Sequence, residues 1–126
     1  MQTINISTTK NKEIIDLTDR INSLLSKGAK LCHLFVKHTT CAVTTADLDP
    51  GTDKDMLEAF WEMIPKLNYR HPHNPAHVPA HIASSIIGPD VTIPIKDGEL
   101  DLGTWQRVIL VELDGPRERE IIINFS

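Results

Sequence analysis

The amino-acid sequence predicts one α+β domain in which strands outnumber helices. Short runs rich in β-branched and apolar residues, separated by Gly, Pro and Asp turns, recur along the chain. Between them lie segments whose apolar residues repeat with helical spacing. A length of 126 residues suffices for one core and is short for two domains, so we treat residues 1–126 as a single unit.

The predicted strands begin at the N-terminus, where Ile4 and Ile6 alternate with polar neighbours over residues 2–8. Later segments with strand-like composition are residues 31–36, 41–45, 91–95, 107–113 and 118–125. The segments 31–36 and 41–45 could pair as a hairpin with His38 near its turn. Turns at residues 97–98 and 114–116 separate the last three strands.

The predicted helices are amphipathic. The first covers residues 14–25 and ends near Gly28, the second begins with a capping box of Thr52 and Asp55, and the third begins at Pro79 and ends near Gly88. The residues expected on their buried faces are Ile14, Leu17, Ile21, Leu24 and Leu25, then Leu57, Phe60, Trp61 and Ile64, then Ile82, Ile86 and Ile87.

Composition argues against several classes of function. The net charge of −4 and the lack of an arginine-rich stripe argue against nucleic-acid binding, and no segment is long and apolar enough for a membrane span. No glycine loop for phosphate and no dinucleotide fingerprint is present. Cys32 and Cys41 lie in predicted strands without a framework of further cysteines, so we expect reduced core thiols in a cytoplasmic protein.

Residues 71–81 contain four of the six histidines and three of the eight prolines. Proline restricts its own backbone and that of the preceding residue, which predicts a stiff, extended loop. Imidazole suits metal ligation and proton transfer near neutral pH. The candidate metal ligands are His73, His77 and His81; the alternative is a surface loop whose histidines are only polar side chains.

His81 lies in the first turn of the third predicted helix. Free backbone N–H groups and the helix dipole favour an anion there and disfavour a protonated imidazole, so a neutral His81 could act as a base or a ligand. The segment His38-Thr39-Thr40 places an imidazole and two hydroxyls at a strand end. Such a group is suited to hold a phosphate or a carbonyl oxygen.

Glu112 shares strand parity with Val108 and Leu110, so its carboxylate is expected to point into an apolar region. A buried carboxylate needs a partner or takes up a proton. It could therefore act as an acid or base, or orient a histidine. The alternative is a salt bridge, for which the local candidates are Arg107, Arg117 and Arg119.

Residues 102–106 combine a glycine, a tryptophan and an amide between two predicted strands. Gly103 could bring the backbone close to a ligand, with the Trp105 indole and the Gln106 amide beside it. Equally, Trp105 could belong to the core, as most tryptophans do.

Taken together, these motifs resemble the YjbQ-like family, labelled secondary thiamine-phosphate synthase. The likeness covers nearly the whole chain, in order, through His38–Thr40, Ala80, His81 and Gly88, residues 93–95, 97–98 and 102–106, Glu112 and residues 114–117. The resemblance implies a compact sandwich of mostly antiparallel sheet with a few helices, a homotrimer, and a polar pocket near subunit interfaces. It also implies a reaction in which the nitrogen of thiazole phosphate displaces diphosphate from aminopyrimidine diphosphate.

The sequence departs from the common family pattern in two places. Thr45-Ala46-Asp47 stands where members often carry Asn-Glu, and Ala76-His77 stands where Asp-Asn is common. The usual glutamate is thus missing unless Asp47 substitutes for it, and His77 adds an imidazole. The site as a whole shifts from carboxylate and amide toward imidazole, which favours a metal such as zinc. Magnesium at Asp47 or Asp49 is the other metal considered.

Two functional hypotheses follow. In an enzyme acting on a small phosphorylated molecule, His81 would be a base or ligand, His38 would hold or protonate the leaving group, and Glu112 would orient an imidazole. Oxygen contacts would come from Thr39, Thr40, Gln106 and Arg117, with Trp105 beside the ligand. The alternative is a non-catalytic or hydrolytic homotrimer that binds a divalent metal, zinc or magnesium, through His73, His77 and His81.

Overall fold

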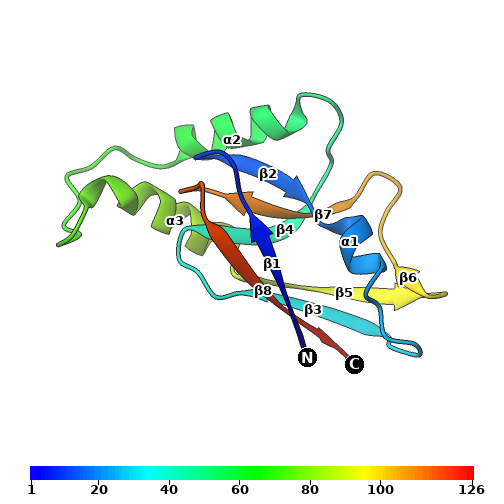
Figure 1. The fold of residues 1–126 in the computed structure, drawn as a ribbon. Helices are drawn as coiled ribbons and strands as arrows, with labels where there is room; N and C mark the ends of the chain where they lie inside the picture. The colour runs from blue at the N-terminus through cyan, green and yellow to red at the C-terminus, as the bar shows by residue number, and fades with distance from the viewer.

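Eight strands, three α-helices and one 3₁₀ helix make up the structure, a computed structural model that describes residues 1–126 (Figure 1). The strands are β1 (Gln2–Ser7), β2 (Glu13–Asp16), β3 (Leu31–Val36), β4 (Cys41–Ala46), β5 (Asp90–Lys96), β6 (Glu99–Leu100), β7 (Arg107–Glu112) and β8 (Glu118–Phe125). The helices are α1 (Thr18–Asn22), α2 (Thr52–Met63), the 3₁₀ helix η1 (Pro75–His77) and α3 (Val78–Ile87).

The strands form two antiparallel sheets, which confirms the predicted α+β fold. The larger sheet has the order β1-β8-β3-β5-β6, and the smaller has the order β2-β7-β4. β7 and β8 follow each other in the chain, yet each is an inner strand of a different sheet. The turn between them, residues 113–117, therefore joins the two layers.

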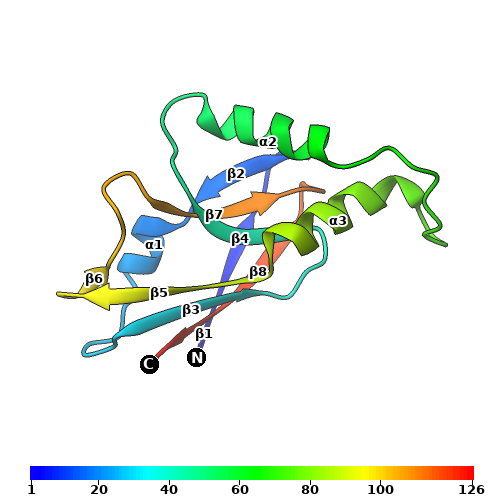
Figure 2. The same ribbon diagram turned by 180° about the vertical axis from the view of Figure 1, so that it is seen from behind.

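The main core lies between the sheets, because alternate side chains of β1, β3, β7 and β8 point inward. Its buried residues include Ile4, Ile6, Leu34, Val36, Val108, Leu110, Ile121 and Ile123. A second cluster on the other face of the smaller sheet packs Ile109 and Val111 against α2 and α3, which Figure 2 shows beside that sheet. Since β7 is covered on both faces, its sequence is a continuous apolar run.

The helix predicted at residues 14–25 is wrong at both ends, because only residues 18–22 are helical. Ile14 and Ile15 belong to β2, where they pair with Val111 and Leu110 of β7. Only the short α1 remains helical, and the side chain of Asp16 accepts a hydrogen bond from the backbone N–H of the first residue of α1 at 3.0 Å. A helix of this length is only marginally stable on its own, so the hydrogen bonds that residues 13–16 gain by pairing with the central strand of the smaller sheet decide their conformation.

The predicted hairpin of residues 31–36 and 41–45 is also wrong. Both strands exist, but β3 belongs to the larger sheet and β4 to the smaller one. Residues 37–40 therefore cross from one sheet to the other. The polar segment His38-Thr39-Thr40 lies in this crossing and not in a hairpin turn.

The two longer helices occupy the predicted regions, with corrections at their ends and faces. Gly51, at φ 90°, precedes α2 without a side-chain cap, so the predicted capping box is absent. In α3, Ile86 is 67% exposed, whereas the small residues Ala80, Ala83 and Ser84 are buried. Small side chains let α3 approach β4 closely enough for the Ser84 hydroxyl to donate to the carbonyl of Cys41 at 2.7 Å.

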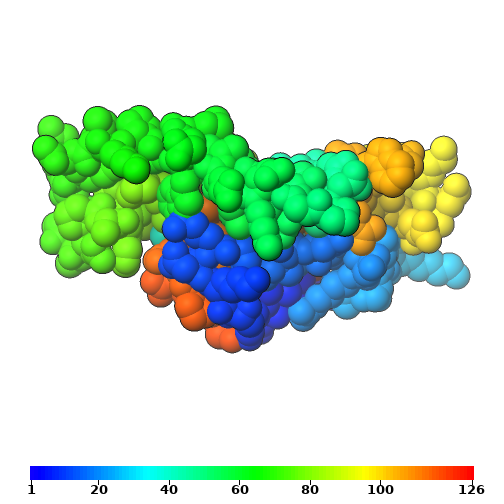
Figure 3. Space-filling view, turned by 90° about the horizontal axis from the view of Figure 1, so that it is seen from above, coloured from blue at the N-terminus to red at the C-terminus, as the bar shows by residue number.

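The two ends of the molecule carry different segments. Figure 3 shows α3 and the loop before it at one end, and β6 with the following residues at the other. None of the helices combines the length and apolar character that a membrane crossing requires.

We expect the side chains on the two faces of β8 to differ in their contribution to stability. Ile121 is fully buried between the sheets, so Ile121→Ala should lower the free energy of unfolding by about 2–5 kcal/mol. Ile122 is its matched control, because it lies on the opposite, partly exposed face of the same strand. Urea unfolding of both variants checks this, and equal losses would contradict the assigned core.

Candidate functional site

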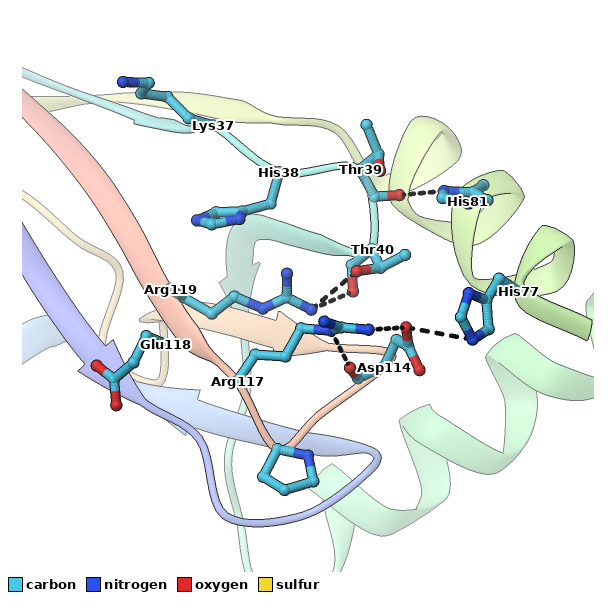
Figure 4. A pocket seen from close by; sticks show the side chains of 11 residues that line it. Lys37, His38, Thr39, Thr40, His77, His81, Asp114, Arg117, Glu118 and Arg119 are labelled. Carbon is cyan, nitrogen blue, oxygen red and sulfur yellow. Dashed lines mark hydrogen bonds and ion pairs between the residues drawn. The ribbon is translucent and has the colours of Figure 1, made fainter. Parts of the chain in front are cut away.

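A polar pocket of about 720 Å³ opens at the end of the molecule that carries α3 (Figure 4). Four segments form it: the crossing at residues 37–40, the start of α3, the β7–β8 turn, and the start of β8. Its lining residues are Lys37, His38, Thr39, Thr40, His77, His81, Asp114, Pro116, Arg117, Glu118 and Arg119. Apart from the proline, every one of these side chains carries a polar group.

The base of the pocket is a buried ion pair between Glu112 and Arg119, which are 0% and 2% exposed. Two hydrogen bonds join them, from Nη2 to Oε2 at 2.5 Å and from Nε to Oε1 at 2.9 Å. Nη2 also donates to the carbonyl and hydroxyl oxygens of Thr40, and the Thr8 hydroxyl donates to Oε1 of Glu112 at 2.7 Å. The carboxylate and the guanidinium are thus compensated as a buried charge pair must be.

This pair sets the charges below the pocket. Burial raises the pKa of Glu112, but hydrogen bonds from Arg119 and Thr8 lower it more, so the pKa lies below its ordinary value. Burial lowers the pKa of Arg119, but the hydrogen bond to Glu112 raises it more, so the pKa lies above its ordinary value. No histidine is among the hydrogen-bond partners of Glu112. Of the sequence alternatives, the contacts therefore match the salt bridge with Arg119 and not the orientation of an imidazole.

His38 lies above Arg119 in the crossing segment (Figure 4). Its Nε2 accepts a hydrogen bond from the backbone N–H of Glu120 at 2.8 Å, which places the ring proton on Nδ1. Burial lowers the pKa of His38, and the charge of Arg119 lowers it further. Neutral His38 therefore offers Nδ1–H as a hydrogen-bond donor, which suits holding an anion better than protonating one.

His81 projects from the first turn of α3, as the sequence predicts. Its Nδ1 lies 3.0 Å from the carbonyl oxygen of Thr39, and because a carbonyl only accepts, Nδ1 carries the proton. In the neutral ring, Nε2 is then left with a free lone pair. The ring of His71 stacks on His81 with centroids 5.4 Å apart and planes at 2°, which fixes the imidazole from a second side.

Asp114 and Arg117 form the third side of the pocket. The Arg117 guanidinium donates to the carbonyl oxygen and to the carboxylate of Asp114, at 2.8 and 2.9 Å. His77 lies 3.9 Å from the same carboxylate and 3.1 Å from the side-chain amide of Asn74. Arg117 is half exposed, so part of its guanidinium faces the solvent in the pocket.

Gly115 lets the β7–β8 turn lie close to the N-terminal segment. A Cβ at this position would overlap the carbonyl oxygen of Lys10 and would be 2.8 Å from the hydroxyl of Thr8 and 2.9 Å from the side chain of Glu112. Real Cβ atoms do not approach backbone so closely. The absence of a side chain here thus allows the turn to carry Asp114 and Arg117 to the pocket.

The structure brings most of the predicted site residues together. His38, Thr39, Thr40, His81 and Arg117 line the pocket, and Glu112 lies directly beneath it. Trp105 and Gln106 do not, because they precede β7 whereas the pocket begins after its end. Six residues of strand span about 17 Å, so these two side chains lie at the opposite end of the smaller sheet.

The three predicted metal ligands do not all lie at the same place in the structure. His77 and His81 line the pocket, whereas His73 does not and instead contacts the ring of His71 at its edge. No group of three or more His, Cys, Asp or Glu side chains is arranged to hold a metal ion. The metal site therefore stays a prediction, and the three predicted ligands do not come together within a single chain.

Among the pocket residues, Lys37 and Glu118 were named in no prediction, and Arg119 was named only as a candidate salt-bridge partner of Glu112. Arg119 carried a usable signal, since it shares strand parity with Ile121 and Ile123 and therefore faces inward. A cation at an inward position requires an anion across the core, and Glu112 has the same property on its own strand.

Removing the charge of Glu112 should destabilise the protein strongly. Glu112→Gln keeps the shape but leaves Arg119 buried without its anion, which typically costs about 3–5 kcal/mol. Because the folded-state pKa is lowered, this carboxylate contributes stability above the ordinary Glu pKa, and the contribution is lost as the pH falls through the folded-state value.

Urea unfolding between neutral and acidic pH checks both effects, with Glu120→Gln as control because that side chain is 44% exposed. The Glu112→Gln variant should be less stable at neutral pH and should lose less on acidification. Equal acid sensitivity of the variant and the unmodified protein would contradict the assigned role of the pair.

Comparison with known proteins places the chain in a family. The family model described as "UPF0047 protein YjbQ-like" matches residues 2–126. A UPF0047 protein of Archaeoglobus fulgidus is 33% identical over 121 residues, covering 95% of this chain and 96% of the relative. The UPF0047 protein YugU of Bacillus subtilis is 36% identical over 129 residues, covering 98% and 96%.

Solved structures of similar sequence have the same fold as this chain. A conserved hypothetical protein of Thermus thermophilus is 31% identical with a TM-score of 0.90, and each chain covers 100% of the other. A structure from Sulfolobus solfataricus, described as a protein of unknown function, is 32% identical with a TM-score of 0.89, covering 98% of this chain and 94% of its own. On the family match over nearly every residue and on relatives of this identity and coverage, the chain belongs to the YjbQ-like UPF0047 family.

Proposed function

We propose that the pocket binds the phosphoryl groups of a small molecule and that the protein is a transferase with weak or secondary thiamine-phosphate synthase activity. The observation that carries this proposal is the set of hydrogen-bond donors around one pocket: Lys37, Arg117, the Nδ1–H of His38, and Nη1 of Arg119, which has no partner in the chain. Guanidinium, ammonium and imidazole N–H groups are the donors that phosphate oxygens prefer.

The proposed reaction joins two phosphorylated heterocycles. The ring nitrogen of thiazole phosphate attacks the methylene carbon of aminopyrimidine diphosphate, and the new C–N bond replaces the C–O bond to diphosphate. The electron pair of the broken bond leaves with the diphosphate, and the thiazole nitrogen becomes positively charged. Because the nucleophile carries no proton, stabilising the departing diphosphate is the main task left to the protein.

The pocket residues have distinct parts in this reaction. Arg117, Lys37 and the Nδ1–H of His38 hold the oxygens of the departing diphosphate. The free Nε2 of His81 accepts a hydrogen bond from the amino group of the pyrimidine, whose acidity increases as the C–O bond breaks. Arg119 is held by Glu112, so its charge is fixed in place before the ligand arrives.

The likeness to the family also supports a homotrimer as the proposed assembly. A divalent metal is the alternative proposal: His77 and His81 would hold it, with further ligands from a bound molecule or a second chain. Metal per chain, measured in untagged protein purified without chelator, tests this reading. About one zinc per chain would support the non-catalytic or hydrolytic alternative, and no metal would contradict it.

Replacing His81 should abolish product formation without unfolding the protein. His81→Ala is expected to lower the rate of thiamine phosphate formation roughly 100-fold or more, the usual effect of removing a positioned acid–base group. His33→Ala is the control, because His33 pairs with Asp90 on the outer face of the larger sheet. The assay measures diphosphate release from the two precursors with magnesium added, and equal rates in both variants would overturn the role of His81.

Anion binding can be tested apart from turnover. Arg117→Ala should weaken binding of inorganic diphosphate about tenfold, and Arg20→Ala, an exposed arginine of α1, should leave it unchanged. Isothermal calorimetry at two salt concentrations measures both, and the affinity of the unmodified protein should fall with added salt. If Arg117→Ala bound diphosphate as tightly as the control, the pocket would not be the anion site.

A further inference from the structure

A second cavity, of about 350 Å³, lies on the other side of the segment where η1 meets α3. Ala76 and Pro79 of this segment line the second cavity, whereas His77 and His81 line the first pocket, and the two share no lining residue. The other walls come from the end of α2 and from the turn between β1 and β2, which Figure 1 shows close together. The complete lining is Lys12, Trp61, Ile64, Pro65, Lys66, Ala76 and Pro79.

The lining combines two cations with an otherwise apolar wall. Lys12 and Lys66 are its charged residues, no carboxylate lines the cavity, and neither lysine forms an ion pair anywhere in the chain. No guanidinium is present, in contrast to the first pocket, so the bidentate contacts that favour phosphate are missing. Such a cavity fits a molecule with an apolar body and a single small anionic group.

The same wall contains a hydrogen-bond donor whose acceptor is missing. The indole Nε1 of Trp61 is the one buried side-chain nitrogen or oxygen without a hydrogen-bond partner. Buried donors are almost always paired, because an unmade hydrogen bond is unfavourable. Lys12 lies over the indole ring, with its Nζ 4.4 Å from the ring centroid, but an ammonium group only donates and cannot satisfy the N–H. The cavity therefore supplies three donors and no acceptor for them.

From these observations we infer that the cavity is a second binding site, which takes a small carboxylate with an apolar body. The carboxylate accepts from the ammonium groups of Lys12 and Lys66 and from the N–H of Trp61, and the body of the ligand lies against the apolar wall. To reach the indole N–H, the carboxylate draws Lys12 off the ring. That side chain is flexible, and its one hydrogen bond is to the neighbouring Asn11 at 3.2 Å.

The indole N–H itself reports on this binding. The chain has two tryptophans, so a ¹H–¹⁵N spectrum contains two indole signals, and Trp105→Phe identifies the one from Trp61. Benzoate is the probe and benzamide, of the same size without the charge, is its matched control. Benzoate should move the Trp61 indole proton downfield with a Kd of about 1 mM, an ordinary affinity for so small a ligand. Benzamide should leave the signal in place.

Variants test whether the named residues form the site. Lys66→Ala should raise the Kd for benzoate roughly 3- to 10-fold, because it removes one charge-assisted hydrogen bond at an exposed position. Lys54→Ala, which removes an exposed lysine at the other end of α2, should not change it. Ala76→Phe fills the cavity and should abolish the response. A signal that benzoate does not move, that benzamide moves equally, or that responds to benzoate in all three variants as in the unmodified protein would overturn the inference.

This inference stands apart from the proposed function. Inorganic diphosphate should leave the Trp61 signal in place, and Arg117→Ala should bind benzoate as tightly as the unmodified protein. A benzoate response in a protein that makes no thiamine phosphate would leave the second site standing and remove the proposed reaction. Thiamine phosphate synthesis without a benzoate response would do the reverse.

Discussion

The buried pair of Glu112 and Arg119 is the interaction on which both the fold and the pocket depend. Glu112 ends the central strand of the smaller sheet and Arg119 lies near the start of β8 in the larger one, so their two hydrogen bonds join the layers. Thr8 and Thr40 add bonds from β1's end and from the crossing segment. Because both groups are buried, separating the sheets at this point would leave two uncompensated charges, which is strongly unfavourable.

The fixed arrangement of the pocket side chains depends on that pair. Three side chains at the site have fixed backbone partners: His38 accepts from β8, His81 donates to the crossing segment, and Arg117 is held by the turn. Fixed tautomers and fixed charges mean that a ligand meets donors already in place, which is the condition for strong electrostatic binding. The site is therefore a product of the junction between the sheets rather than of a mobile loop.

Strand positions were predictable because their signal is local. β3 and β8 have the predicted bounds, and the parity of Glu112 predicted its burial. Sheet membership was not predictable, since nothing in residues 31–46 indicates that neighbouring strands enter different sheets. Likewise, residues 14–16 have a helical pattern and become a strand only because β7 offers an unpaired edge. The family motifs identified the pocket residues, but they did not show that Trp105 lies a strand's length away from them.

Gly115 and the two ends of β7 have a consequence for how such a protein changes over evolutionary time. The close fit of Gly115 against Lys10, Thr8 and Glu112 ties the β7–β8 turn to the core, so this part of the surface tolerates little variation. The loop at the opposite end of β7 rests on one amide and carries no core residue at its tip. Substitutions at that tip should therefore accumulate over evolution without disturbing the turn that carries Asp114 and Arg117.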